Sequence, residues 1–324
     1  WTLAQRSTVD ALQLAQIQLH SQHCPSSTRL FFPLTRSPQL AHTLELSMVA
    51  SVAVIQGAGG SIGSHLARHL LTRSSLSIVG TSRDPSSAKR AILSGLEGQN
   101  VDESRLKVFE VDVREAETVR KAAQEVEKEF GKKSLRLLIN ASGVLHADKS
   151  IREIDSQTLL DSFHLNTFGH LLTFKHFYPL LPQKNDIRNS SSSSSEGEDP
   201  ANGVVQPGLG VLASLTARIG SIGDNQKGGW YAYRASKAAA NQVIATLQRE
   251  LSLRSTPSIA VALHPGTVVG TNLSKPWTKE EDAGKKEGVH RADEATGKLL
   301  DVIKGLSEQD GGRFLDYAGK EIPW

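Results

Sequence analysis

Residues 51–73 read SVAVIQGAGGSIGSHLARHLLTR, a short β-branched run followed by three regularly spaced glycines and by leucines at helical spacing. This order of strand, glycine-rich turn and helix is typical of the first unit of a dinucleotide-binding fold. Gly57, Gly60 and Gly63 allow a tight turn, close approach of the backbone to a pyrophosphate, and close packing of the helix on the sheet. The amides at the helix N-terminus then face the phosphates. The alternative, an ordinary loop between a strand and a helix, fits the flanking sequence less well.

The same alternation of strand and helix continues along the chain. Apolar runs typical of strands recur between stretches with helical spacing of apolar residues. This pattern predicts an α/β protein with a single-domain Rossmann fold, a doubly wound parallel sheet with helices on both faces. The predicted strands cover 51–56, 76–83, 105–113, 134–140, 210–215, 258–263 and 313–317, and the predicted helices cover 64–73, 86–96, 115–130, 156–178, 230–253 and 292–306.

The composition excludes several classes of protein. The chain has 324 residues, of which 38% are hydrophobic and 22% are charged, as in ordinary globular proteins. The net charge is only +3 and its basic residues are interspersed with acids, so we predict no nucleic-acid partner. No apolar run reaches the roughly 18 residues of a membrane span, so we predict no membrane partner either. With Cys24 as the only cysteine, and with His164, His170 and His176 too widely spaced for one helix face, we predict no metal site.

Two segments differ in composition from the remainder. Residues 1–47 are poor in acids and are predicted to be an extension outside the folded domain, which covers 48–324. The extension is either transit-like, which would indicate a plastid or a mitochondrion, or upstream sequence before Met48, in which case we predict a cytoplasmic protein. Residues 183–209 are polar and contain six consecutive serines, and we predict that they form a disordered insertion without a catalytic role.

A candidate catalytic pair lies in residues 230–241, which read WYAYRASKAAAN. Tyr233 and Lys237 are four residues apart in a helix-favouring run, so both side chains project from one face. A neighbouring ammonium favours the phenolate and lowers the pKa of a tyrosine hydroxyl. Such a group can protonate a carbonyl oxygen or deprotonate an alcohol while hydride moves at the carbon. Tyr231 has no lysine partner, because Ala235 stands four residues after it.

Residues at the predicted strand ends indicate how a cofactor would bind. Ser82 and Arg83 end the second strand, where a basic residue accepts the 2′-phosphate of NADP and an acidic residue binds the 2′-hydroxyl of NAD. We therefore favour NADP(H) over NAD(H), although Asp84, one residue later, favours NAD(H). Asp112 ends the next strand and is predicted either to hydrogen-bond adenine or to cap a helix. Small residues at 141–144 let a cofactor approach the backbone.

Two more features lie near the predicted site. Asn166 stands inside a long apolar helix next to Gly169, where it lowers helix propensity and indicates a special role, although a simple cap or kink is the alternative. Pro265, Gly266 and Thr267 follow the strand at 258–263 directly and predict a rigid turn at the carboxyl edge of the sheet.

Taken in order, these motifs resemble those of the short-chain dehydrogenase/reductase family, and the resemblance covers essentially all of 49–324. The segments TARIGSIGDN, GGWYAYRASKAAAN, LHPGTV and GKEIPW are similar to those of the C-factor-like and sniffer-type carbonyl reductases. The resemblance implies an NAD(P)-dependent Rossmann enzyme with a tetrad of Ser, Tyr, Lys and Asn. Family members are often dimers or tetramers, which makes a homodimer or homotetramer the expected assembly.

The resemblance also implies residue roles. Tyr233 would be the general acid/base, Lys237 would hold the nicotinamide ribose, and Asn166 would anchor a water in a proton relay. The pyrophosphate turn would consist of Gly57, Ser61, Ile62 and Gly63, and further cofactor contacts would come from Asn140 and Gly143, in the position of the family's NNAG motif.

The chain departs from the family pattern at the catalytic serine. That serine stands three residues before the glycine that is here Gly220, and the position holds Ala217. Ser214, Thr216 and Ser221 are the neighbouring hydroxyls that could polarise the carbonyl instead, and we choose Thr216. Two smaller departures are Ser61 at the middle glycine of the turn and NASG in place of NNAG.

The sequence thus predicts an NADPH-dependent reductase of a small carbonyl compound with Tyr233 as general acid. A second hypothesis is an NAD(P)-binding signalling or regulatory module with little turnover, which the missing serine permits. The identity of the substrate is not predicted.

Overall fold

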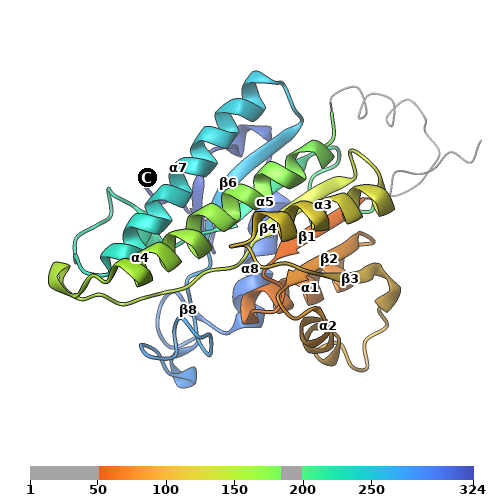
Figure 1. Ribbon diagram of the computed structural model, residues 1–324. Helices are drawn as coiled ribbons and strands as arrows, with labels where there is room; N and C mark the ends of the chain where they lie inside the picture. Colours follow the sequence, from red (N-terminus) through yellow and green to blue (C-terminus); the bar gives the residue numbers. More distant parts are fainter. Residues whose placement is uncertain (1–50, 184–198) are drawn as a thin grey trace, which may run out of the picture. The chain divides into compact units, whose positions relative to one another are not determined.

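The computed structural model of the protein describes residues 51–183 and 199–324. Residues 1–47 and most of the predicted insertion therefore lie outside the described residues. A seven-stranded parallel sheet, in the order β3-β2-β1-β4-β5-β6-β9, forms the centre of the domain (Figure 1). This arrangement confirms the predicted α/β class, the Rossmann fold and the parallel sheet with helices on both faces.

The strands and helices agree closely with the sequence prediction. The strands are β1 (Val52–Gln56), β2 (Ser77–Ser82), β3 (Leu106–Glu110), β4 (Leu135–Asn140), β5 (Gly210–Leu215), β6 (Ser258–His264), β7 (Thr267–Val268), β8 (Val289–His290) and β9 (Phe314–Asp316). The helices are α1 (Ser61–Arg73), α2 (Pro85–Ser94), α3 (Ala116–Phe130), α4 (Ser156–Phe163), α5 (Gly169–Phe177), α7 (Tyr231–Leu253) and α8 (Ala292–Gly305). A π turn at His164–Phe168 separates α4 from α5, and short 3₁₀ turns lie at 103–105, 151–153, 178–180, 218–220, 280–282 and 308–310.

Two hydrophobic cores lie on the two faces of the sheet. Strand β1 shows the reason, because all its residues are buried and successive side chains point to opposite faces. Ala53 and Ile55 pack in the core with α1, α2 and α8, whereas Val52 and Val54 pack in the core with α3, α5 and α7. Figure 1 shows these two helical layers on either side of the sheet.

The segment at 199–209 contributes to the core. Asp199 accepts hydrogen bonds from Arg136 at 2.8 and 3.0 Å, and Arg136 also donates to the carbonyls of Gln206 and Leu209. Residues 199–209 are therefore packed at the amino edge of the sheet, which corrects our prediction of a disordered insertion over 183–209. This segment is ordered because it buries apolar side chains, although its overall composition is polar. The buried side chains are those of Ala201, Val204, Val205 and Leu209.

The carboxyl ends of the parallel strands meet at one edge of the sheet. Strands β1, β4, β5 and β6 end there, each followed by a loop that carries residues named from the sequence. Strand β7 follows β6 and pairs with β8 in a small separate sheet that the sequence pattern did not predict. This edge is where an open α/β sheet binds its ligands.

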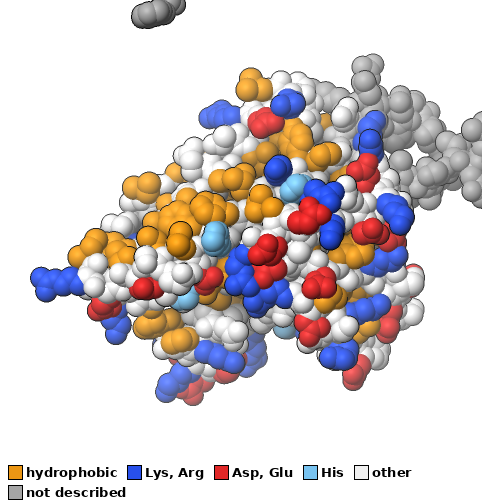
Figure 2. All heavy atoms as spheres, in the orientation of Figure 1, with side chains coloured by type: hydrophobic (Ala, Val, Ile, Leu, Met, Phe, Trp, Pro, Cys, Tyr) orange, Lys and Arg blue, Asp and Glu red, His pale blue; other side chains and the backbone are white. Residues whose placement is uncertain are grey.

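The surface carries apolar side chains outside this edge. Figure 2 shows hydrophobic side chains gathered along α4 and α5. The large ones exposed on these helices and on the π turn between them are Leu160, Phe168 and Leu171. Among the helices of residues 51–183 and 199–324, none combines the length and the apolar character that a membrane span needs.

Candidate active site

Helix α7 places Tyr233 and Lys237 one turn apart, and both side chains are buried, with 7% and 3% exposure. The helix packs against the π turn through Thr167 Oγ1, which donates to Ser236 O at 2.7 Å. A residue of the loop after β4 caps the first turn of α7: Ala232 N donates to Asp148 Oδ2 at 3.3 Å. The pair predicted from the sequence is therefore held on a fixed helix at the carboxyl edge of the sheet.

Lys237 and Asn166 converge on Gly143. A Cβ atom at position 143 would lie 3.1 Å from Asn166 Oδ1 and 3.5 Å from Lys237 Nζ. Lys237 Nζ donates to Leu215 O at 2.8 Å, which anchors the ammonium to the end of β5. Glycine at 143 thus leaves room for these two polar groups. The structure brings together three residues that are 23 to 94 positions apart in the sequence.

Burial determines the protonation of the pair. It lowers the pKa of Lys237 from 10.5 to about 7, because an ammonium is poorly solvated in the interior. It raises the pKa of Tyr233 above its ordinary value for the same reason. We predicted that Lys237 lowers the tyrosine pKa. The structure shows the opposite direction, because desolvation of Tyr233 is the effect that dominates and Lys237 donates to Leu215 O.

Asn166 is placed by a feature that the sequence pattern did not reveal. The π turn at His164–Phe168 interrupts the helix and turns the Asn166 amide group inward, where it is fully buried. Its Oδ1 accepts from Val144 N and its Nδ2 donates to Val144 O, both at 2.9 Å. Nδ2 also donates to Ser236 Oγ at 3.0 Å. Asn166 therefore connects the loop after β4 to α7, and π turns of this kind often occur at functional sites.

The three candidate hydroxyls all have partners within the protein. Thr216 Oγ1 donates to Asn241 Oδ1 at 2.7 Å, so its proton points toward α7. Ser214 Oγ accepts from Asn140 Nδ2 at 3.3 Å, and Ser221 Oγ accepts from Asp224 N at 3.0 Å. In this arrangement Thr216 cannot also donate to a substrate. Our choice among these hydroxyls stays a prediction.

A fourth hydroxyl belongs to Ser142, which the sequence reasoning overlooked. Its Oγ donates to Leu165 O at the long distance of 3.4 Å, and its backbone N lies where a Cβ of Gly57 would collide, at 2.9 Å. Serine in the NASG segment was the signal that could have identified it. Ser142 therefore lies in the loop that carries Gly143, at the place where this loop packs against the glycine turn.

The glycine turn is built for a ligand that approaches the backbone. Gly57 has a φ of +84°, which favours glycine, and a Cβ at Gly63 would lie only 2.3 Å from Gly57 O. Gly60 is the N-cap of α1 and has no side chain to occupy the first amides of the helix. Ser61 and Ile62 form the first turn of α1. These free amides and the absence of Cβ atoms fit a pyrophosphate.

Arg83 and Asp84 follow β2, and Asp112 follows β3; their side chains differ in exposure and in hydrogen-bond partners. Arg83 is exposed at the end of β2, whereas the Asp84 carboxylate caps α2 by accepting from Ser87 N at 2.9 Å. Asp112 accepts hydrogen bonds from Arg114, which lower the pKa of its carboxyl group, and Arg83 contributes a weaker effect in the same direction. Asp84 is thus used in a helix cap.

The remaining predicted cofactor residues lie at the same edge. Asn140 ends β4 fully buried; its Nδ2 donates to His170 O and Ser214 Oγ, both at 3.3 Å, while its Oδ1 has no partner within the described residues. Pro265 and Gly266 follow β6, and a Cβ at Gly266 would lie 2.7 Å from Gly288 O. Thr267 begins β7 and pairs with Val289 of β8.

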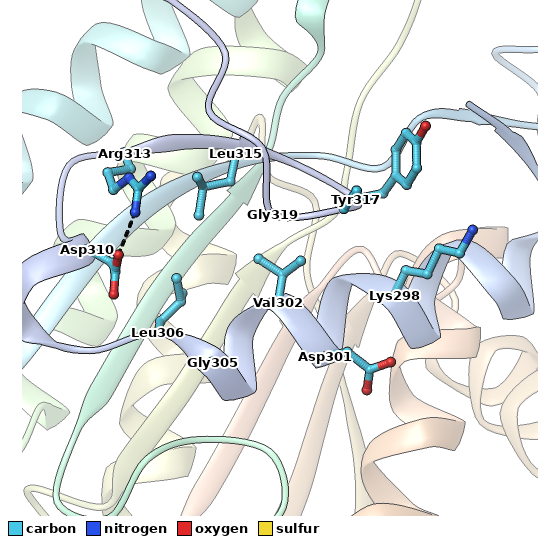
Figure 3. Close-up of a pocket in the computed structure, with 11 residues that line it drawn as sticks. Lys298, Asp301, Val302, Gly305, Leu306, Asp310, Arg313, Leu315, Tyr317 and Gly319 are labelled. Carbon is cyan, nitrogen blue, oxygen red and sulfur yellow. Dashed lines mark hydrogen bonds and ion pairs between the residues drawn. The ribbon is translucent and has the colours of Figure 1, made fainter. Parts of the chain in front are cut away.

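The described part of the chain holds no group of three His, Cys, Asp or Glu residues suited to a metal ion. His170 is buried, and burial lowers its pKa to about 3. A cavity of about 440 Å³ lies between α8 and the chain around β9, and Figure 3 shows Arg313 bound to Asp310 at one end and Tyr317 at the other. This cavity does not include Tyr233.

Known proteins are similar to this chain in sequence and in architecture. A family model described as short chain dehydrogenase matches residues 51–204. The C-signal protein of Myxococcus xanthus is 30% identical over 188 residues, which are 58% of this chain and 92% of that protein. Short-chain dehydrogenase srdF of Neurospora crassa is 27% identical over 279 residues, which are 85% of this chain and 98% of that protein.

Solved structures agree with these relatives. An NADPH-bound carbonyl reductase from chicken fatty liver is 27% identical with a TM-score of 0.66, covering 85% of this chain and 99% of that one. The carbonyl reductase Sniffer of D. melanogaster shares the fold, with 24% identity and a TM-score of 0.65 over 85% of this chain and 100% of that one. The chain belongs to the short-chain dehydrogenase family. It is accordingly an NAD(P)-dependent oxidoreductase.

Proposed function

We propose that the protein is an NADPH-dependent reductase of a small carbonyl compound, with Tyr233 as the general acid. The observation that carries the proposal is the buried pair of Tyr233 and Lys237 on α7, beside Asn166 and Gly143. The pair lies at the carboxyl edge of a parallel sheet whose first turn fits a pyrophosphate. An acid at this place can act on a carbonyl group next to a bound nicotinamide.

The residues of this chain supply proton transfer and position. Bound NADPH supplies the hydride that reaches the carbonyl carbon. Tyr233 gives its phenolic proton to the carbonyl oxygen, so the product is an alcohol and the side chain becomes a phenolate. Burial keeps the hydroxyl protonated before the reaction. Lys237, one turn away on the same helix, would hold the nicotinamide ribose, as the family resemblance implies.

The preference for NADPH rests on the end of β2. Arg83 is exposed there and has a planar cationic group suited to a phosphate. The carboxylate of Asp84, which could repel a 2′-phosphate, is directed to Ser87 N in the cap of α2. The chicken fatty liver relative is described as NADPH-bound, which supports the same preference. We propose Arg83 as the 2′-phosphate contact.

The hydroxyl groups of the site support a second candidate function. Ala217 replaces the expected serine, and Thr216, Ser214 and Ser221 are all hydrogen bonded within the protein. A site that lacks the serine of the family's tetrad would bind the cofactor and turn over slowly. This observation supports an NAD(P)-binding regulatory module as the alternative.

The two functions differ in turnover and are separated by one experiment. NADPH oxidation is measured with a panel of aldehydes, ketones and quinones, and again with cofactor deuterated at C4 of the nicotinamide. The reductase predicts an alcohol that carries deuterium on the former carbonyl carbon. Tight NADPH binding with no turnover on any compound in the panel supports the regulatory module instead.

We also propose that a second copy of the chain covers the apolar stripe on α4 and α5. Leu160, Phe168 and Leu171 lie along these helices with between 42% and 51% of their surface exposed. Large apolar side chains gathered on one helical face are typical of an interface. The stripe supports the homo-oligomer expected from the family resemblance.

A further inference from the structure

An aromatic pair beside Tyr233 has no role in the chemistry described above. The Trp230 ring lies 6.4 Å from the Tyr233 ring at an interplanar angle of 70°, and 5.3 Å from the Trp277 ring at 51°. These separations are typical of direct aromatic contact. We call Trp230 and Trp277 the aromatic wall. It joins residues from the start of α7 and from the segment after β7.

Trp230 has an uncommon backbone conformation. Its φ of 53° and ψ of 45° place it in the left-handed region, which is rare for a large side chain. Its amide donates to Asp148 O at 2.6 Å, and the Asp148 carboxylate accepts from Ala232 N. Residues strained in this way persist where the surroundings fix them, and they cluster at functional sites.

Arg234 fixes the turn that precedes Trp230. Its guanidinium donates to the carbonyls of Gly228, Gly229 and Ile219 at distances of 2.8 to 3.2 Å. The turn is therefore bound to the loop after β5 as well as to Asp148. These contacts hold the backbone of the residues before Trp230, whose indole contacts the ring of Tyr233.

Trp277 is also fixed, yet 45% of its surface is exposed. Its amide donates to Ser274 O at 2.8 Å, and the buried Ser274 is hydrogen bonded in turn to Thr271. A large apolar side chain that is half exposed has surface left for contact with a ligand. The ring contacts connect Trp277, through Trp230, to the ring that carries the proposed proton donor.

We propose that the aromatic wall binds the planar ring system of the substrate and makes the enzyme select aromatic or conjugated carbonyl compounds over aliphatic ones. The inference rests on the proposed reductase function. A flat ring gains stacking and apolar contact with Trp230 and Trp277, whereas a flexible aliphatic chain gains less contact and loses more conformational freedom. Trp230 and Trp277 are then residues that determine specificity.

The test compares two 1,2-diketones that differ in planarity, 9,10-phenanthrenequinone and 2,3-hexanedione. We expect the ratio of their kcat/KM values to favour the planar compound in the wild type. We expect Trp230→Gly and Trp277→Ala each to lower this ratio about tenfold, since one aromatic contact contributes about that factor. Glycine adopts the left-handed conformation freely, so Trp230→Gly removes the indole without straining the turn.

Ser255→Gly is the matched control, because Ser255 also has a positive φ, of 52°, and lies at the other end of α7. The control should leave the ratio unchanged. An unchanged ratio in both tryptophan variants, or an equal loss on both diketones, overturns the inference while leaving the reductase function standing. If the wild type reduces neither diketone nor any carbonyl of the wider panel but binds NADPH, the reductase function fails, and the inference fails with it.

Discussion

The buried Lys237 allows a prediction of how stability depends on pH. Its pKa falls from 10.5 to about 7 on folding, which corresponds to roughly 4 to 5 kcal/mol of cost for the charged form. Because the folded-state pKa is the lower one, the unfolded state binds more protons between about pH 7 and 10.5. The free energy of unfolding therefore rises with pH across this window. The cost is fully present below pH 7.

Lys237→Met removes this cost and keeps a similar volume. The substitution also leaves Leu215 O without the hydrogen bond at 2.8 Å, which costs about 1 to 3 kcal/mol. We therefore expect the variant to be about 2 kcal/mol more stable than the wild type at pH 6, while it loses reductase activity. The measurement is urea unfolding followed by circular dichroism at pH 6, 7.5 and 9.

The control is Lys89→Met, which replaces an exposed lysine on α2. It should change neither the stability nor its pH dependence by a comparable amount. The reasoning is refuted if Lys237→Met is less stable than the wild type at pH 6. It is equally refuted if its stability rises with pH as steeply as that of the wild type between pH 7.5 and 9.

Three further predictions follow from charges and backbone conformation. Arg83→Glu should lower the ratio of kcat/KM for NADPH over NADH at least tenfold, because a charge-assisted contact is replaced by repulsion; an unchanged ratio contradicts Arg83 as the phosphate contact. Arg136→Ala should lower the free energy of unfolding by about 2 to 3 kcal/mol by removing the ion pair with Asp199 and the hydrogen bonds to the carbonyls of Gln206 and Leu209, and a loss below about 0.5 kcal/mol in urea unfolding would count against this packing. Ser255→Gly should raise the free energy of unfolding by about 0.5 kcal/mol, since relief of the left-handed strain exceeds the added chain entropy; a loss of stability would show that the strain is absent.

Regular patterns made the fold predictable. The glycine turn at 57–63 and the alternation of apolar strands with helices are local signals, and they reproduced every strand of the large sheet. The spacing of Tyr233 and Lys237 likewise placed both side chains on one helix face, because a helix fixes that relation by itself.

Features that depend on distant contacts were not predictable in this way. The π turn that aims Asn166 is set by packing of three elements, and the left-handed Trp230 is set by Asp148. The pKa of Tyr233 followed burial and not the nearby charge, since the sequence does not reveal that Lys237 bonds Leu215 O. Residues 199–209 resemble a polar linker in composition but carry the carboxylate that pairs with Arg136.

The central claim is that Tyr233 is the proton donor of a reductase. The most direct measurement compares Tyr233→Phe with Tyr231→Phe, since Tyr231 is the first residue of the same helix and is 39% exposed. The account predicts that Tyr233→Phe lowers kcat by at least 100-fold and binds NADPH with the wild-type Kd, whereas Tyr231→Phe retains turnover. Turnover by Tyr233→Phe close to that of the wild type, with the cofactor bound equally well, would contradict the account.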